Sequence, residues 1–591
     1  MKKQSLIGRF NIWRNKHVDE QYFLIIISAV IGLSSGLAAY ILKSGVYFIE
    51  ELLTARFHME SQNYLYVIYP LIGIILSVFL VKYLLNDRTR QGIPRILFVI
   101  SRLDGKMRIH KFFSSIFGST LTAGFGGSIG LESPIIASGS SIGSGIGQLF
   151  KLNYKTRTLL IGCGAAGAMA SIFTTPVAAV IFSLEVLMLD LTTASIIPLS
   201  IASVTGAITT KLLLAERFLF NFSVSEGFEV SDIPFFFILG ILSGLISLYF
   251  NVTHYWLANL MDRYHYYINK TLLGGLLLGL IIFIFPPLFG EGYEMIRMIV
   301  SGHSEDLLNN SFFYKMKDNS WMVLVVIGMI MLLKVIATTL TTEAGGIGGI
   351  FAPAAIMGGL SGFIFSNAYN QLGWEKQLSE TNFTLVGMAA VLGGVLHAPL
   401  TAIFLIAEMN SGYALFVPLM LSTSISFLTV KAIDPHSIFT RELAQRGDLI
   451  THHKDKTVLT LLKLNNLIDK DLQTISPDSS LGDLTKIIAK SKRNIFPVVE
   501  DDNKYIGLVV MDDVREDMFN QELYDRPISE YIIQSPEEIS PHESMQTVLD
   551  KFNRTGNYNL PVIFKGKYIG FVSRANIFNA YRKTLQEVSD E

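Results

Sequence analysis

The stretch GFGGSIGLESP, residues 124–134, places one carboxylate, Glu132, among four glycines and two residues before Pro134. Long apolar runs flank it, so the carboxylate is expected at membrane depth, where an ionisable residue is costly and usually faces a water-filled path. Glycines let backbone N–H groups approach a ligand closely, and proline suits the first turn of a helix. The stretch therefore predicts a helix N-terminus that faces an anion, although small residues also allow membrane helices to pack closely.

The composition indicates a membrane protein with a further module attached. Half of the 591 residues are hydrophobic and only 16% are charged, which is too apolar for an ordinary soluble protein and too long for one domain. Acidic and basic residues balance at 49 and 48, so no nucleic-acid partner is indicated. The single cysteine, Cys163, excludes a disulfide framework and is expected in the core. Apolar segments long enough to enter a bilayer lie at about 22–49, 64–85, 110–123, 158–188, 194–214, 233–261, 270–287, 320–341, 351–370, 383–408 and 413–433.

An internal repeat divides the apolar part into two related halves. FTTPVAAVIFSLEVL, from Phe173, aligns without gaps with LHAPLTAIFLIAEMN, from Leu396. Glu185 and Glu408 end the matched helices of this alignment and are expected to be structural. A glycine-rich break followed by proline precedes each copy, GSIGLESP in the first half and GGIGGIFAP, residues 345–353, in the second. Paired interruptions in two halves point to the binding site of a transporter.

A second repeat occupies the charged C-terminal part. Residues 475–514 match residues 539–577, and each copy predicts a helix, a strand that ends near a proline, a hairpin to a second strand, and another helix. Such pairs resemble tandem CBS domains, which sense adenosine ligands. The predicted fold class is an all-α polytopic membrane protein of two inverted halves followed by an α/β CBS pair. The expected parts are a cytoplasmic segment 1–20, the membrane domain 21–445, a linker 446–465, and CBS domains 466–530 and 531–591.

Four stretches make the membrane part resemble the CLC family of chloride channels and chloride/proton exchangers. Residues 91–94 (QGIP) resemble the family's G-S-G-I-P, residues 130–134 its G-[KR]-E-G-P, and residues 349–353 its G-x-F-x-P. Residues 437–439 (SIF) resemble the terminal helix that carries its anion-coordinating tyrosine. By this resemblance Glu132 is the gating glutamate, a tethered anion that competes with chloride for the same donors. The resemblance implies an anion-binding set of Gln91, Gly92, Ile350, Phe351 and Phe439, and pore-motif positions at Gly130, Leu131, Ser133, Pro134, Gly349 and Pro353.

Several positions depart from the family pattern. Gln91 replaces a serine, and Phe439 replaces the pore tyrosine and so removes a hydroxyl donor. Leu131 and Ser133 replace a basic residue and a glycine beside Glu132. Where the exchangers place a second glutamate that passes protons, this chain has Val186, which cannot titrate. Val186 thus favours passive conduction over proton exchange.

The CBS pair keeps only part of the family's ribose-binding signature, a Ser or Thr followed three residues later by Asp. The first copy has Val510 with Asp513, and the second has Ser573 with Asn576. The sequence therefore leaves two interpretations of the CBS pair open: an adenine nucleotide site at Asp513, Ser573 and Asn576, or a purely structural role in dimerisation.

The function expected from the sequence is chloride conduction with voltage- or pH-sensitive gating by Glu132, in a transport protein rather than an enzyme. A chloride/proton antiporter and a fluoride exporter of the same family are the alternatives. A metalloprotease is excluded because His542-Glu543 lacks a second histidine at residue 546, and no metal site is expected. The resemblance implies a homodimer in the plasma or inner membrane of a prokaryote, in contact with lipid and with small anions. Basic residues before the first apolar run favour a cytoplasmic N-terminus, and the CBS pair is also expected in the cytoplasm.

Overall fold

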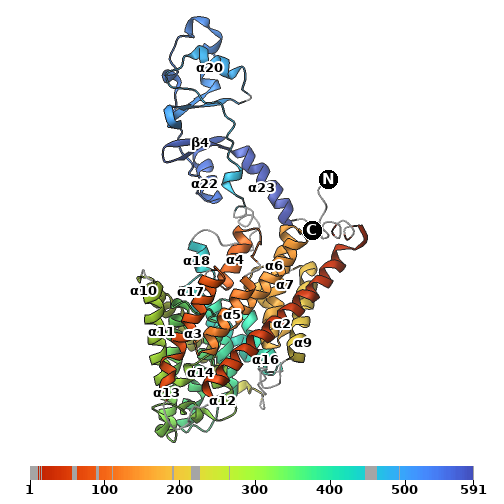
Figure 1. Cartoon of the computed structure of the whole chain (residues 1–591), viewed down its shortest axis with the longest axis vertical. Helices are drawn as coiled ribbons and strands as arrows, with labels where there is room; N and C mark the ends of the chain where they lie inside the picture. Colours follow the sequence, from red (N-terminus) through yellow and green to blue (C-terminus); the bar gives the residue numbers. More distant parts are fainter. Residues whose placement is uncertain are drawn as a thin grey trace. The chain divides into compact units, whose positions relative to one another are not determined.

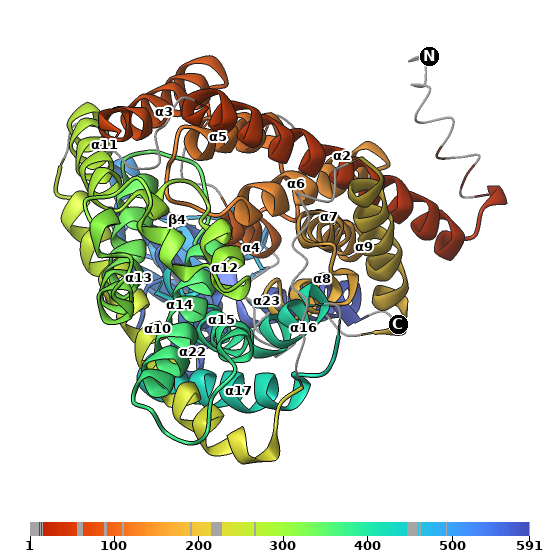
Figure 2. The same ribbon diagram turned by 90° about the horizontal axis from the view of Figure 1, so that it is seen from below.

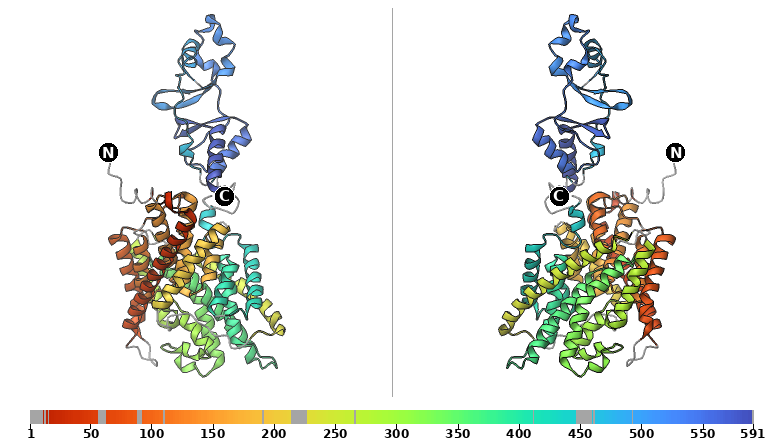
Figure 3. Two further views of the ribbon diagram at one scale, coloured as in Figure 1. Left: turned by 90° about the vertical axis from the view of Figure 1, so that its right-hand side faces the viewer. Right: turned by 90° about the vertical axis from the view of Figure 1, so that its left-hand side faces the viewer.

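The computed structural model describes residues 11, 14, 16–55, 63–87, 92–108, 111–189, 192–213, 227–264, 267–410, 412–445, 459, 462–491 and 493–589. The chain forms two compact units, Met1–Arg446 and Gly447–Glu591, and each is described by itself. The first unit consists of long helices, and the second of short helices and strands (Figures 1 and 3). The predicted fold class is confirmed.

The first unit is a bundle of helices, most of which are apolar. Among the described residues, eight helices are long and apolar enough to cross a membrane. Its first half contains α2 (Glu20–Thr54), α3 (Tyr69–Val78), α4 (Ile93–Arg102), α5 (Lys111–Gly124), α6 (Glu132–Leu149), α7 (Tyr154–Phe173), α8 (Pro176–Glu185) and α9 (Thr193–Leu213). Its second half contains α10 (Ile233–Met261), α11 (Tyr267–Ile284), α12 (Tyr293–Val300), α13 (Ser320–Glu343), α14 (Phe351–Gln371), α15 (Glu380–Leu396), α16 (Pro399–Met409), α17 (Phe416–Ile433) and α18 (Arg441–Gln445).

Two of the apolar segments that contain a proline are each broken there into two helices. Residues 158–188 form α7 and α8, and residues 383–408 form α15 and α16. Each break contains a residue in the left-handed conformation, Thr174 with φ 58° and His397 with φ 55°, two residues before Pro176 or Pro399. A proline has no N–H group to donate to the preceding turn of a helix, and its ring clashes with that turn, so the chain turns and starts a new helix there. The same break therefore occurs at the same point of both halves.

The helices that follow the two glycine-rich breaks pack in the same way in both halves. A Cβ atom added to Gly143 of α6 would lie 1.9 Å from the carbonyl oxygen of Leu160 in α7. A Cβ atom added to Gly362 of α14 would lie 1.9 Å from the carbonyl oxygen of Phe383 in α15. These backbones touch directly, as small residues permit in membrane helices. Figure 2 shows α6, α7, α14 and α15 inside the unit and α2, α9, α10, α11 and α17 toward its outside.

The two repeat glutamates join the halves reciprocally. Glu408, near the end of α16, accepts hydrogen bonds from the N–H groups of Val177 (3.1 Å) and Ala178 (2.8 Å) at the start of α8. Glu185, at the end of α8, accepts from the N–H groups of Leu400 (3.1 Å) and Thr401 (2.7 Å) at the start of α16. Each carboxylate thus satisfies the free donors of the other half's helix. These contacts are structural, as the sequence predicts for both residues.

Removing either carboxylate charge is expected to destabilise the membrane unit by a similar amount. Glu185→Gln and Glu408→Gln each place an amide NH₂ group against backbone donors, which costs about 1–3 kcal/mol for a partly buried group. Both variants should lower the thermal unfolding midpoint of the purified protein. Glu305→Gln, at an exposed glutamate in the same unit, is the control and should leave the midpoint unchanged. A large loss in only one of the two variants would contradict the reciprocal arrangement.

The second unit contains two similar α/β modules. The first has α20 (Leu481–Ile488), β1 (Ile495–Val499), β2 (Tyr505–Val510) and α21 (Met511–Val514). The second has α22 (Met545–Thr555), β3 (Asn559–Phe564), β4 (Lys567–Ser573) and α23 (Arg574–Ser589). In each module the two strands pair antiparallel, with a register shift near the hairpin. The two predicted copies are therefore built alike.

The proline that the two copies share lies two or three residues before the end of its strand, near the end as the sequence predicts. Pro497 stands opposite Leu508 in the β1–β2 pair, and Pro561 stands opposite Phe571 in the β3–β4 pair. A proline has no N–H group to donate, but its carbonyl can still accept. Here the carbonyl of Pro497 accepts from Ile475, and that of Pro561 accepts from Ile539, so the strand continues through the proline.

Contacts between the modules make them one unit. Asp469, which precedes the first module, exchanges two backbone hydrogen bonds with Phe571 of β4 (2.8 and 2.9 Å). Leu508 of β2 exchanges two with Ile533, which follows the first module (3.0 and 2.9 Å). The rings of Tyr505 and Tyr568 stack between the modules with their centroids 6.2 Å apart.

Candidate functional site

The two glycine-rich breaks meet in the middle of the membrane unit. The N–H group of Gly130 donates to the carbonyl of Gly349 (2.9 Å), and the N–H group of Gly349 donates back to Gly130 (2.8 Å). This short antiparallel pairing brings the first residues of α6 and α14 side by side. The free N–H groups and partial positive charges of two helix N-termini therefore face one small volume.

Threonines of the preceding helices hold the two breaks in matching ways. The N–H group of Ser128 donates to Thr341 Oγ1 of α13 (3.2 Å), and that of Ile347 donates to Thr122 Oγ1 of α5 (3.1 Å). Each half thus supplies the side chain that orients the other half's break. A Cβ atom on Gly127 or on Gly346 would lie 2.7 Å from Thr122 Cγ2, so the glycines of both breaks also allow close packing, as the alternative interpretation expects.

Glu132 is the first residue of α6, and its side chain is only 1% exposed. Its carboxylate faces its own backbone N–H group and that of Ala352 in the first turn of α14. The hydroxyl of Tyr293, the first residue of α12, donates to Glu132 Oε1 at 2.9 Å. Oε2 lacks a hydrogen bond among the described residues. The carboxylate therefore occupies the position that an anion would take at these two helix starts.

Three helix starts converge at this point because glycines leave no side chain between them. A Cβ atom on Gly130 would lie 2.1 Å from Glu132 Oε2, and one on Gly349 would lie 2.7 Å from Ser133 Cβ. Gly92, which precedes α4 and has a φ of 120°, also lies next to Ser133, with a Cβ position 3.6 Å away. The structure thus brings together Gly92, Gly130, Ser133 and Gly349 of the predicted motifs.

The donors predicted for the central anion are available. Ile350 and Phe351 precede and begin α14, and both are buried. In the part of the chain that the structure describes, neither N–H group donates a hydrogen bond. The ring of Phe351 packs against Phe173, with centroids 5.7 Å apart, and Phe173 packs against Tyr293 at 6.1 Å. An aromatic wall therefore lies beside the two helix starts.

The remaining predicted positions are placed as follows. Phe439 is buried just before α18, and α18 contacts α4. Val186 is buried directly after α8, where its N–H group donates to Phe182. Pro134 and Pro353 lie in the first turns of α6 and α14 and are buried. Leu131 is buried beside Glu132. Gln91 lies outside the described residues.

Four side chains near Glu132 were not found from the sequence. Besides Tyr293, these are Glu291, which lies between two glycines in the loop before α12, and the fully buried lysines Lys43 of α2 and Lys334 of α13. Both lysines interact electrostatically with Glu291 and with Glu132. A lysine inside an otherwise apolar membrane helix is itself a signal of function, and that signal could have found them.

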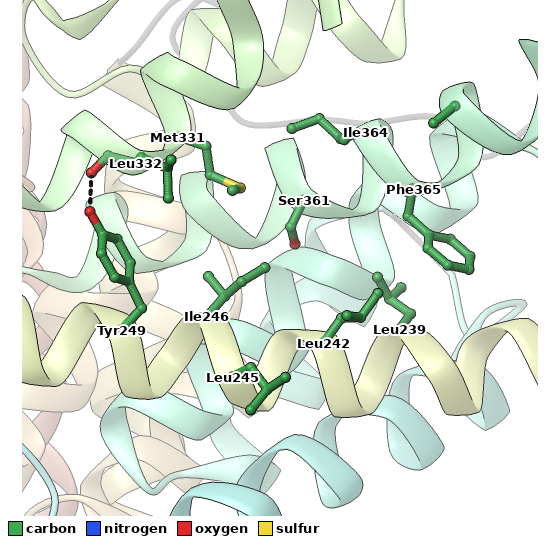
Figure 4. A pocket seen from close by; sticks show the side chains of 11 residues that line it. Leu239, Leu242, Leu245, Ile246, Tyr249, Met331, Leu332, Ser361, Ile364 and Phe365 are labelled. Atoms are coloured by element: carbon green, nitrogen blue, oxygen red, sulfur yellow. Dashed lines mark hydrogen bonds between the residues drawn. The ribbon is translucent and has the colours of Figure 1, made fainter. Parts of the chain in front are cut away.

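An apolar pocket elsewhere in the unit is separate from these residues. Its volume is about 420 Å³, and it lies between α10, α13 and α14 (Figure 4). Tyr249 donates to the carbonyl of Leu332 at its edge, as the dashed line in Figure 4 shows. Several of its leucines, Leu242, Leu245 and Leu332, are exposed. Nothing in this pocket binds an anion by charge, so the helix starts remain the candidate site.

In the C-terminal unit, the predicted nucleotide residues are only partly available. Ser573 Oγ accepts the N–H group of Asn576 at 3.1 Å and so caps the start of α23, which is a structural role. Asp513 is exposed in α21. The nucleotide site stays a prediction. Among the described residues there is no group of three or more His, Cys, Asp or Glu side chains that could hold a metal ion.

Comparison with known proteins supports the same interpretation of both units. The family model described as "Voltage gated chloride channel" matches residues 73–431, and the CBS domain model matches residues 464–520 and 528–583. The chain is 26% identical over 440 residues to the "H(+)/Cl(-) exchange transporter ClcA" of Vibrio campbellii, which covers 71% of this chain and 89% of that protein. It is 24% identical over 566 residues to "Chloride channel protein CLC-f" of Arabidopsis thaliana, over 85% of this chain and 70% of that protein.

A solved structure shares the fold. A slow cyanobacterial Cl⁻/H⁺ antiporter matches with a TM-score of 0.60 and 24% identity over 72% of this chain and 97% of its own. The prediction of a passive channel is not confirmed by these relatives, since both exchangers and channels are named among them. The family model alone covers more than half of the 591 residues. The chain therefore belongs to the voltage-gated chloride channel (CLC) family and carries two CBS domains at its C-terminal end.

Proposed function

We propose that this protein moves chloride across a membrane in exchange for protons, and that Glu132 is both the gate and the proton-carrying group. The observation that carries the proposal is the buried Glu132 carboxylate at the starts of α6 and α14. A charged carboxylate and a chloride ion compete for the same N–H groups, because both are anions in a region of low dielectric. When Glu132 binds a proton it loses its charge, leaves these donors and admits the anion.

The relatives support exchange over simple conduction. The Vibrio campbellii relative is named an H⁺/Cl⁻ exchange transporter, and the cyanobacterial structure of the same fold is named a Cl⁻/H⁺ antiporter. Proton exchange requires that the gate's proton be taken up on one side and released on the other. Glu132 is the only carboxylate of the predicted pore motifs, so it is the group through which that proton passes.

A passive chloride channel is the second candidate, and Val186 favours it. The side chain at this position is buried and apolar, so it neither binds a proton nor orders a water chain by itself. In an exchanger of this sequence, protons must reach Glu132 by another route. Phe439 and Gln91 replace a tyrosine and a serine of the family pattern, which leaves fluoride as an alternative anion.

Simultaneous measurement of anion and proton movement distinguishes these functions. The purified full chain is reconstituted in liposomes with a chloride gradient, and chloride and pH electrodes record both fluxes. We expect protons to move against chloride in a fixed ratio. Chloride flux without proton movement would contradict the exchanger and support the channel. The same recording with fluoride in place of chloride tests the anion.

The assembly and the cellular location are proposed from the family resemblance. We expect a homodimer with one pore in each subunit, in the plasma or inner membrane, with the N-terminus and the CBS pair in the cytoplasm. An adenine nucleotide at the CBS pair would regulate transport.

A further inference from the structure

The loop before α12 lies along the GFGGSIGLESP stretch and covers it. The N–H group of Gly290 donates to the carbonyl of Gly126 (3.3 Å). A Cβ atom on Gly126, whose φ is 90°, would lie 2.0 Å from the ring of Phe289, so only glycine fits there. Two residues later in the loop, the Glu291 carboxylate faces the N–H group of Leu131. The loop therefore holds a second carboxylate against the residue that precedes Glu132.

Two buried lysines fix this loop and the stretch beneath it. Lys334 Nζ donates to Ser128 Oγ (2.9 Å) and to the carbonyls of Glu291 (3.0 Å) and Gly290 (3.4 Å). Lys43 Nζ donates to the carbonyl of Ile172 near the end of α7 (2.7 Å). Neither lysine is exposed, and a buried charge is stable only when it is paired and hydrogen-bonded. Since carbonyls carry only partial charges, the nearby carboxylates are the partners that balance these lysines.

Two carboxylates and two lysines thus form one buried charge cluster, contributed by α2, α6, α13 and the loop before α12. Both lysines interact electrostatically with both Glu291 and Glu132, and Glu291 also interacts electrostatically with Glu132. Tyr293 adds a hydrogen bond to Glu132. Further from Glu132, the other titratable or charged groups that face Glu291 or its neighbours are Tyr47 and Glu50 of α2, Tyr66 before α3, and Glu294 and Arg297 of α12.

We propose that Glu291, held between Lys43 and Lys334, sets the proton concentration at which Glu132 leaves the starts of α6 and α14. A negative charge near Glu132 favours its neutral, protonated form, whereas a positive charge favours its ionised form. Glu132, Lys43 and Lys334 are all buried, so solvent screens these effects less than it screens the effect of a surface charge. Glu291 is a positioning and tuning residue, and Glu132 remains the gate.

The proposal rests on the proposed function, because it takes Glu132 to gate transport by protonation. It also explains how this chain manages without the basic residue that the family places beside the gate, where Leu131 stands here. Lys43 and Lys334 supply positive charge from two other helices instead. Glu291 then offsets part of that charge, so that Glu132 can still be protonated and released.

Two charge-removing variants should shift the pH dependence of transport in opposite directions. Without its negative neighbour, Glu132 holds its charge more firmly, so Glu291→Gln should move the midpoint of the pH–flux curve to lower pH. Lys43→Gln keeps a donor for Ile172 but removes a positive charge, so it should move the midpoint to higher pH. We expect each shift to be about one pH unit, which corresponds to a tenfold change in proton concentration.

A control variant and a double variant separate charge from structure. Glu305→Gln removes an exposed carboxylate of the membrane unit that is not among the groups named above, and it should leave the midpoint unchanged. Lys43→Gln combined with Glu291→Gln removes one charge of each sign and should return the midpoint toward the native value. If Glu291 and Lys43 had only a structural role, the two single variants would reduce flux but would not shift the midpoint of the pH–flux curve in opposite directions. If Glu291→Gln does not fold, Glu291→Asn gives the same test.

The outcomes distinguish this proposal from the function on which it rests. Flux of the full chain is recorded in liposomes over a series of pH values, with Glu132→Gln in the same series. If Glu132→Gln removes the pH dependence while Glu291→Gln and Lys43→Gln leave the midpoint unchanged, the tuning role is overturned and the gate stands. Shifts of the same sign in both variants would also overturn it. If Glu132→Gln keeps the native pH dependence, the proposed gate itself is wrong.

Discussion

Glu132→Gln is expected to give anion flux that no longer depends on pH and no longer moves protons. In the native chain the charged carboxylate lies against the amides of α6 and α14, and a single helix terminus stabilises a nearby charge by about 0.3–1 kcal/mol, up to ~2 in partly buried geometry. Two such termini acting together stabilise the charged carboxylate by about 0.6–2 kcal/mol, up to ~4, so they favour the closed position by a factor between about three and several hundred. Glutamine has nearly the same shape but no charge, so it does not compete with the anion in this way at any pH.

The measurement is the ratio of flux at low and high pH in liposomes. We expect the native chain to change by about tenfold or more and Glu132→Gln by less than about twofold, as expected for loss of a group that binds the proton. Glu380→Gln is a matched control, because Glu380 also begins a helix, α15, and accepts a hydrogen bond from Asn367 (2.7 Å). It should keep the native pH dependence. If the flux through the Glu132→Gln protein stays steeply pH-dependent, the assignment of Glu132 as the gate is wrong.

The sequence was sufficient to predict the two paired helix starts and the relation between the two halves, because both follow from local sequence patterns. Gly130 and Gly349 each stand in a glycine-rich break before a proline, and the repeat relates them. Their mutual hydrogen bonds are a contact that two related segments form when they meet. The reciprocal contacts of Glu185 and Glu408 follow from the same symmetry. These features depend on which residues stand near each other in the chain.

The cluster around Glu132 could not be predicted in the same way, since its members come from elements far apart in the sequence. Tyr293 is 161 residues from Glu132, and no motif joins them. Lys43 and Lys334 were visible as charges in apolar helices, but the helix face that each occupies relative to Glu132 depends on tertiary packing. Pro176 and Pro399 mark two of the apolar runs as interrupted, but the sequence does not show that Thr174 and His397 take the left-handed conformation at these turns.

The second large effect concerns the crossings of α6 with α7 and of α14 with α15. Gly143→Ala and Gly362→Ala each place a Cβ atom 1.9 Å from a backbone carbonyl oxygen of the neighbouring helix, at Leu160 and Phe383. A backbone carbonyl cannot rotate away as a flexible side chain can, so the two helices must move apart. Overpacking typically costs about 1–3 kcal/mol and occasionally more, and a clash with backbone belongs at or above the upper end. Both variants should therefore have a lower free energy of unfolding and give a lower yield of folded protein.

Gly328→Ala in α13 is the matched control, because nothing lies within 4 Å of a Cβ atom built there. Alanine favours a helix over glycine by about 1 kcal/mol, so this variant should keep or slightly raise the thermal unfolding midpoint. The yield of monodisperse protein and the unfolding midpoint in detergent are measured for all three variants. Since the start of α6 carries Glu132 and that of α14 carries the facing amides, separating either helix from its partner also displaces the gate. A Gly143→Ala or Gly362→Ala protein that still folds should therefore show a weaker pH dependence of flux. If either variant is as stable and as pH-dependent as Gly328→Ala, the prediction that these helix crossings tolerate no side chain is wrong.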